Sequence, residues 1–116
     1  GMFNFCKSLT SLDVSSFNTS NVTSMMGMFG NCSGLKSLDV SSFDTSKVTD
    51  ISYMFKGCSG LTSLDLSGWN ISEGTTITNM FEGCSNSLTI RMKGCSEATI
   101  NKVTSVKPSG ASISTE

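Results

Sequence analysis

Cysteine is the residue type best placed to do chemistry in this chain, because four of its five copies recur at one spacing. Cys6, Cys32, Cys58 and Cys84 follow one another at equal intervals, and Cys95 comes after them. Stacked repeats would bring neighbouring cysteines to about 4.8 Å, within the Cα range of a disulfide. Stacked side chains point in parallel, however, and zinc needs four converging ligands, for which the chain has no histidine. We predict buried free thiols and no metal site, with a Cys84–Cys95 bridge left open.

A second row of the same period carries carboxylates and hydroxyls. Its members are Asp13, Asp39 and Asp65, with Ser11, Ser37 and Ser63 two positions before them. Such a row could bind calcium or a basic partner, since carboxylate oxygens suit both. The alternative is that each Asp bonds hydroxyl and amide groups in its own turn, a common role of Asp beside Ser. Arg91 takes the next place in the row and is expected to neutralise part of it.

Four residues break the repeat because they are large where their equivalents are small or polar. They are Phe5, Met26, Tyr53 and Lys56. Exposed residues of this kind are candidates for partner specificity. Phe5 could instead pack on a neighbouring repeat unit.

Other chemistries find little support in the composition. The chain has no histidine, no cysteine near a base and no glycine-rich phosphate loop, so we predict no catalytic residue, no cofactor and no enzyme activity. Eight Lys and Arg against nine Asp and Glu give a net charge of −1, which argues against binding nucleic acid or anionic lipid. No apolar run approaches the roughly 18 residues that a membrane span needs. Instead, 23 Ser and 13 Thr predict a surface rich in hydroxyl groups.

These rows must be positioned by an internal 26-residue repeat. Met-Phe pairs begin each unit at Met2, Met28, Met54 and Met80. Each of the first three units then has Leu, Leu, Leu or Val, and an aromatic residue in the pattern L-x-x-L-x-(L/V)-x-x-aromatic. Its inner alternation is typical of a short strand with one buried face. The Met-Phe-x-x-Cys segment predicts one or two helical or 3₁₀ turns, and Val22 with Met25 predicts an opposite wall. One unit cannot bury its own apolar side chains, so we expect stacked units with a shared core.

We therefore divide the chain into repeats over 1–94 and a C-terminal cap or linker over 95–116. The units are 2–27, 28–53, 54–79 and a terminal unit 80–94. In the third unit Ile71 and Gly74 replace Thr and Val, which predicts a distorted second wall. The stretch ATINKVTSV alternates apolar and polar residues and predicts an extended segment across the end of the core. The tail after Pro108 reads as a disordered end or linker.

The run MFGNCSGLKSLDVSSFDTSKVTDISYMF closely resembles the BspA-like leucine-rich repeat family of bacterial surface proteins in its 26-residue variant, over about residues 2–92. The resemblance implies a right-handed repeat solenoid with short parallel strands and short helical turns, exported to the cell surface or secreted. The chain opens inside a repeat, so we expect the export signal outside the given residues.

The resemblance also implies adhesion or contact with a partner, and we expect the flat strand face to meet a protein or glycan ligand, host extracellular ligands included. The alternative is a structural spacer that presents another domain and has no ligand of its own. A third hypothesis is end-to-end self-association assisted by calcium.

Overall fold

The computed structural model describes residues 8–116, so Phe5 and Cys6 lie outside the described residues. Regular elements within that range are short and follow one another in a simple order. They are β1 (Ser37–Asp39), β2 (Ser63–Asp65), β3 (Thr89–Arg91), α1 (Glu97–Val106) and β4 (Ser112–Ser114).

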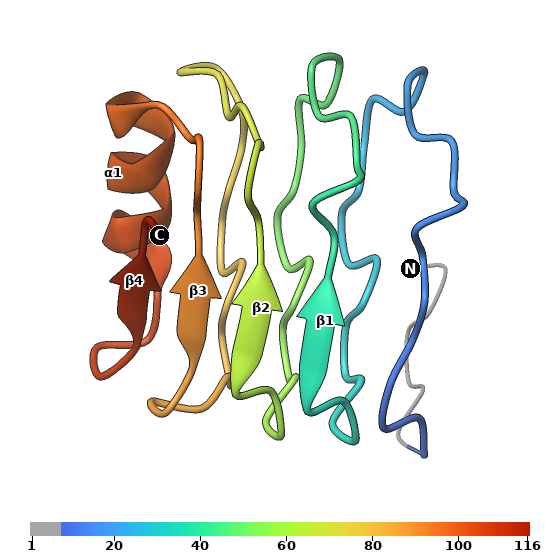
Figure 1. Cartoon of the computed structure of the whole chain (residues 1–116), viewed down its shortest axis with the longest axis vertical. Coiled ribbons are helices and arrows are strands. Elements are labelled where there is room, and N and C mark those ends of the chain that lie inside the picture. Colours follow the sequence, from blue (N-terminus) through green and yellow to red (C-terminus); the bar gives the residue numbers. More distant parts are fainter. Residues whose placement is uncertain (1–7) are drawn as a thin grey trace.

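The four strands form one parallel sheet in the order β1-β2-β3-β4 (Figure 1). Leu38 pairs with Leu64 and Leu64 with Ile90, so each step along the first three strands equals one repeat period. On the opposite wall, Asp50 forms parallel bridges with Ser24 and Thr76, again one period away on either side. The repeat units therefore lie side by side in the register that the sequence period predicts.

The core is built from equivalent side chains that lie next to one another in successive units. The rings of Phe29, Phe55 and Phe81 stack with centroids 5.8 and 5.6 Å apart, and all three are almost fully buried. Leu38 and Leu64, at the centres of the strands, are likewise buried. Each unit thus completes its neighbour's core, which confirms the predicted sharing of one apolar interior.

The first unit departs from the predicted strand pattern. Val14 is buried and Leu12 half-buried, as the alternation predicts, but no strand forms within 11–14. The Lys36 N–H donates to the Thr10 carbonyl at 3.3 Å, and this segment makes no ladder with β1 among the described residues. The side-chain alternation is correct here, whereas the expected strand is wrong.

The Met-Phe segments form separate turns with i→i−3 hydrogen bonds, so the predicted 3₁₀-type bonds are present, whereas a continuous helical turn is not. Met54 N–H donates to Ile51 O at 3.3 Å, and Lys56 N–H to Tyr53 O at 3.1 Å. The backbone is left-handed at Tyr53 (φ 59°) and Gly57 (φ 77°), so the chain changes direction between successive turns. A right-handed helix cannot continue through residues with positive φ, which is why the helical spacing does not yield a helix.

The second wall of the third unit keeps its register, contrary to the expected distortion. The bridge between Asp50 and Thr76 continues the row. Ile71 is buried, and buried Thr75 donates its hydroxyl to Val48 O at 3.4 Å. Thr75 contacts the neighbouring unit in place of the missing valine, so Gly74 can lie exposed without opening the wall.

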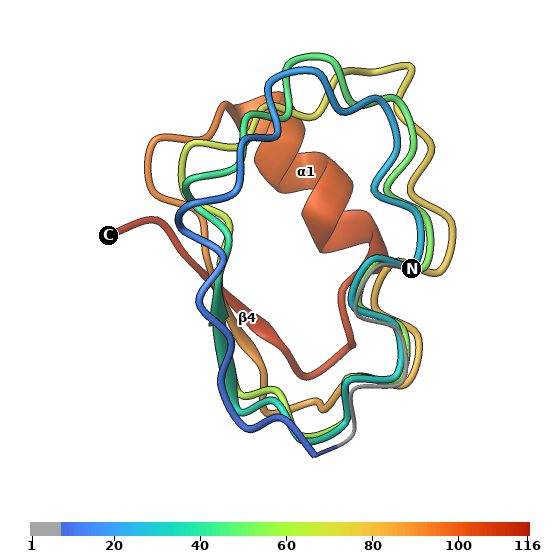
Figure 2. The ribbon, with the colours of Figure 1, turned by 90° about the vertical axis from the view of Figure 1, so that its right-hand side faces the viewer.

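Residues 97–106 form helix α1, so the predicted extended segment is wrong. Ser96 caps the helix by accepting the Thr99 N–H at 3.2 Å, and Glu97 lies in the first turn, where a carboxylate complements the helix dipole. Thr99 and Val103, one helical turn apart, are buried. In a view along the direction in which the units are stacked, α1 lies across the interior that the repeats outline (Figure 2). It covers one end of the core.

The tail is ordered as strand β4, which corrects the expected disorder. Met92 N–H donates to Ser114 O at 2.7 Å, and Gly110 N–H donates to the Asn86 side chain at 3.2 Å. Buried Ala111 packs on the core. The strand Ser112–Ser114 is too short for alternation to reveal it, and its partner strand β3 lies on the far side of α1 in the sequence.

Candidate functional site

The strand face is the outer face of the sheet, formed by two rows of side chains that alternate with the buried centre of each strand. Strand pairing aligns Ser37 with Ser63 and Asp39 with Asp65. Further pairing extends the serine row through Thr89 and Ser112, and the aspartate row through Arg91 and Ser114. The predicted Asp and Ser rows therefore lie on one surface, and Ser11 and Asp13 lie exposed in the first unit.

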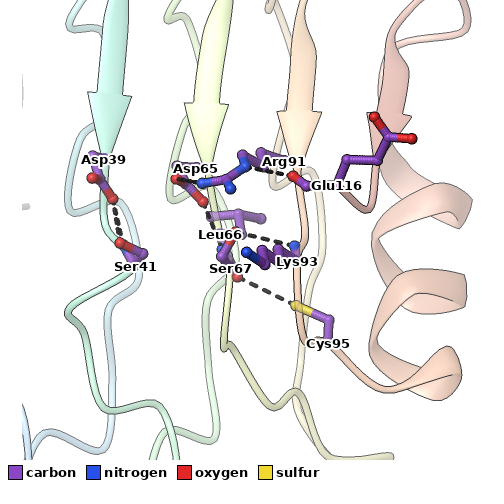
Figure 3. A network of polar contacts seen from close by, with 9 residues as sticks. All are labelled: Asp39, Ser41, Asp65, Leu66, Ser67, Arg91, Lys93, Cys95 and Glu116. Atoms are coloured by element: carbon purple, nitrogen blue, oxygen red, sulfur yellow. Dashed lines mark hydrogen bonds and ion pairs between the residues drawn. The ribbon is translucent and has the colours of Figure 1, made fainter.

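Each aspartate of this face accepts hydrogen bonds from the serine two positions later. Asp39 Oδ1 accepts the Ser41 N–H at 2.9 Å and the Ser41 hydroxyl at 2.5 Å (Figure 3). Asp13 makes the same pair of bonds with Ser15, at 3.0 and 2.6 Å. The predicted local turn is thus confirmed. It uses one oxygen of each carboxylate, and Oδ2 of Asp13 and of Asp39 accepts no hydrogen bond from residues 8–116.

Arg91 neutralises part of the row, as expected. Its Nη1 donates to Asp65 Oδ2 at 3.1 Å, and its Nε donates to the Glu116 main-chain oxygen at 2.7 Å (Figure 3). Arg91 thereby ties the aspartate row to the end of the chain. The Ser67 hydroxyl accepts the Lys93 N–H at 3.0 Å, so the turn after Asp65 is also joined to the next unit.

Hydrogen bonding lowers the pKa of two carboxylates of this row, Asp13 and Asp65. The Ser15 hydroxyl, and then the Ser15 amide, lower the pKa of Asp13. For Asp65, partial burial raises the pKa, but hydrogen bonds from Ser67 and Arg91 outweigh that effect and the net shift is downward. Asp13 therefore favours its anionic form and forms no ion pair with a cation of residues 8–116, whereas Asp65 is paired with Arg91.

A hollow of about 400 Å³ opens where the first unit departs from β1. Asp13 and Ser15 line it from the first unit, and Ser37, Asp39 and Ser41 from the second. Leu12 and Val14 add apolar surface. The hollow combines two carboxylates with several hydroxyl groups, which suits a basic side chain or a sugar hydroxyl.

A cation site is not assembled within residues 8–116, where no group of three or more Asp, Glu, Cys or His side chains is placed to hold a metal ion. Within the same residues, no helix is long and apolar enough to cross a membrane.

The cysteines in the described residues are free thiols buried to different degrees. Cys32 and Cys58 are fully buried, while Cys84 and Cys95 are half-buried. The Cys84 thiol donates to Phe55 O at 3.1 Å and the Cys95 thiol to Leu66 O at 3.4 Å, so the structure holds these two unbridged. Burial raises the pKa of Cys58 to about 12, which makes it a poor nucleophile.

The irregular residues lie away from the strands, in the Met-Phe turn. Lys56 Nζ lies 5.4 Å from the Tyr53 ring centroid, a cation–π contact. Tyr53 is half-buried with φ 59°, at the position where Gly27 and Asn79 also have positive φ. Met26 is 52% exposed. These residues are separate from the hollow, and Tyr53 does not join the Asp and Ser rows.

Sequence reasoning missed the hollow itself. Ser42 lines it, yet nothing in the repeat distinguishes Ser42 from the other exposed serines. The departure of the first unit from β1 also leaves no trace in the sequence, since Leu12 and Val14 match the pattern of the paired strands. The repeat therefore identifies Asp and Ser residues that line the hollow, but not the opening between the two units.

A family model described as "Mycoplasma protein of unknown function, DUF285" matches residues 1–107. The chain belongs to this family. The DUF285 match spans all the repeat units together with α1, and ends before β4. Searches of curated proteins and of solved structures returned no match.

Proposed function

We propose that this DUF285 chain is a non-catalytic binding module, a right-handed solenoid of the BspA-like leucine-rich repeat kind, displayed on the cell surface or secreted. Its ligand is a protein or glycan, including host extracellular ones, and the strand face is its contact surface. The repeat resemblance supports this proposal, and the DUF285 match supports a bacterial repeat-type protein.

The observation that carries it is the hollow between Asp13 and Asp39. Both carboxylates are exposed, and each keeps one oxygen free of hydrogen bonds from residues 8–116. The turn bonds fix the orientation of each carboxylate before a ligand arrives, which lowers the entropic cost of binding. Ligand ammonium, guanidinium or hydroxyl groups would donate to those oxygens.

Replacing the carboxylates of Asp13 and Asp39 by amides, which keeps their turns intact, tests whether the hollow binds the ligand. Asn18 accepts the Ser20 N–H and hydroxyl just as Asp13 accepts those of Ser15, so Asn maintains this turn. We expect Asp13→Asn with Asp39→Asn to weaken binding to matrix proteins or glycans on an array by at least about tenfold, since charge-assisted hydrogen bonds contribute roughly 1.5 to 3 kcal/mol each.

Asp44→Asn is the matched control. Asp44 lies exposed in an identical turn with Ser46, but it is not among the residues that line the hollow. Binding should be unchanged in that variant. Equal binding by the double variant and the parent chain would remove the hollow from the proposed function.

A structural spacer is the second candidate, and the turn geometry favours it. The hydrogen bonds that Asp13, Asp39 and Asp65 accept from the serines of their own turns give each carboxylate a local structural role that needs no ligand. If the chain is a spacer, no protein or glycan on the array should bind it. Its melting temperature should then be the same with and without any of those proteins or glycans in solution.

A further inference from the structure

Backbone N–H groups of the Met-Phe turns join each inner unit to the next one. In each turn, three alternate N–H groups donate to carbonyl oxygens of the following unit, at 2.6 to 3.0 Å. The pairs are Gly27 to Ser52, Phe29 to Met54, Asn31 to Lys56, Tyr53 to Thr78, Phe55 to Met80 and Gly57 to Glu82. Alternate main-chain carbonyls of the following unit therefore fit against every inner turn.

The same three donors in the terminal unit have no such acceptor. The N–H groups of Asn79, Phe81 and Gly83 donate to no carbonyl or side chain within residues 8–116. Positive φ at Asn79 (51°) and Gly83 (81°) matches the inner turns, so these groups face the end of the row of units as their equivalents do. Polar main-chain groups of this kind require a partner when covered.

A hollow of about 490 Å³ lies over these donors. The turn that contains Asn79, Phe81 and Gly83 forms one side, together with the exposed carboxylate of Glu82. Ser105 and Val106, at the end of α1, form the other side with Pro108. The helix covers the core beside the turn and leaves the edge of the turn accessible.

We propose that this hollow binds a peptide whose alternate main-chain carbonyls accept the N–H groups of Asn79, Phe81 and Gly83. The inner turns donate the equivalent N–H groups to alternate main-chain carbonyls, and adding a peptide main chain to open backbone donors is a recurring mode of recognition. Glu82 disfavours a small anion and selects a peptide with Lys or Arg beside it.

Nuclear magnetic resonance of the ¹⁵N-labelled chain tests the site directly. The probe is a blocked serine-rich hexapeptide with one lysine, and its comparison carries glutamate in place of the lysine. We expect the lysine peptide to shift the amide signals of Asn79, Phe81 and Gly83 in a saturable manner and to slow their hydrogen exchange. The glutamate peptide should shift them far less, and Glu82→Gln should reduce the difference between the two peptides.

Variants of α1 separate the hollow from the rest of the helix. Ser105→Trp fills the hollow and should abolish the shifts, whereas Asn101→Trp, on an exposed position that does not line it, should leave them. Circular dichroism checks that both variants fold.

Three results would overturn the proposal: no shifts at those amides, shifts that persist in Ser105→Trp, or inorganic phosphate shifting the amides where the peptide does not. The strand-face variants Asp13→Asn and Asp39→Asn are at the other hollow and should leave the peptide signals unchanged. Either binding proposal can therefore fail without the other.

Discussion

The stacking of Phe29, Phe55 and Phe81 in the core can be tested, because Phe55 and Phe81 differ in the number of stacked rings that they contact. Phe55 is fully buried and stacks on both Phe29 and Phe81, at 5.8 and 5.6 Å, whereas the stacking partner of Phe81 is Phe55. Leucine retains most of the apolar volume but removes the ring. Each ring pair contributes about 0.5 to 1.5 kcal/mol beyond its buried area. Phe55→Leu should therefore lose about 1 to 3 kcal/mol through stacking, and Phe81→Leu about half as much.

Urea denaturation followed by fluorescence measures both losses, because Trp69 is the one tryptophan and is 1% exposed. Circular dichroism should give the same midpoints if unfolding is two-state. The double variant should show a coupling energy close to one ring pair. Equal destabilisation by the two single variants, or no coupling, would refute the register-based account of the core.

Three further predictions concern a thiol, the cap and pH. Cys58 should resist iodoacetamide at pH 8 in the folded chain and react in urea, because its burial raises the pKa to about 12; mass spectrometry of the modified peptide checks this. Thr99→Val should destabilise the chain by about 1 to 3 kcal/mol in urea denaturation, since the Ile71 N–H, which donates to the Thr99 hydroxyl at 3.0 Å, would be buried unpaired. The pKa of Asp65 is lowered on folding, so its stabilising contribution is complete above the unfolded value near 3.8 and is lost as pH falls through the lower folded pKa. Asp65→Asn should therefore show a weaker fall in melting temperature below about pH 4 than the parent chain, and an identical fall would contradict this assignment.

Properties that depend on the repeat could be predicted from the sequence. The repeat period places Leu38 beside Leu64, and it aligns Asp39 with Asp65 and Arg91. These follow because identical units bury their side chains only when equivalent positions meet. The local bonds of Asp39 with Ser41 were also predictable, since Asp-x-Ser forms this turn wherever it stands.

Features outside the repeat were harder to predict. Helix α1 had a recognisable beginning, with Ser96 as the cap and Glu97 in the first turn, but the apparent alternation in ATINKVTSV obscured the spacing of Thr99 and Val103. Strand β4 forms only because the edge of β3 offers partners, which is a non-local cause. The left-handed conformation of Tyr53 was visible indirectly, because Gly27 stands at the equivalent position.

The polar outer side of α1 limits how such chains can change in length. Glu97, Asn101 and Thr104 are exposed there, so another repeat unit would meet a largely polar helix surface at that end. Duplication in the middle meets no such obstacle, because every inner unit offers the same donors and acceptors to both neighbours. Each inserted copy would lengthen the sheet by about 4.8 Å and leave the terminus intact. Gene duplication alone could thus change the length of the stack of units in fixed steps.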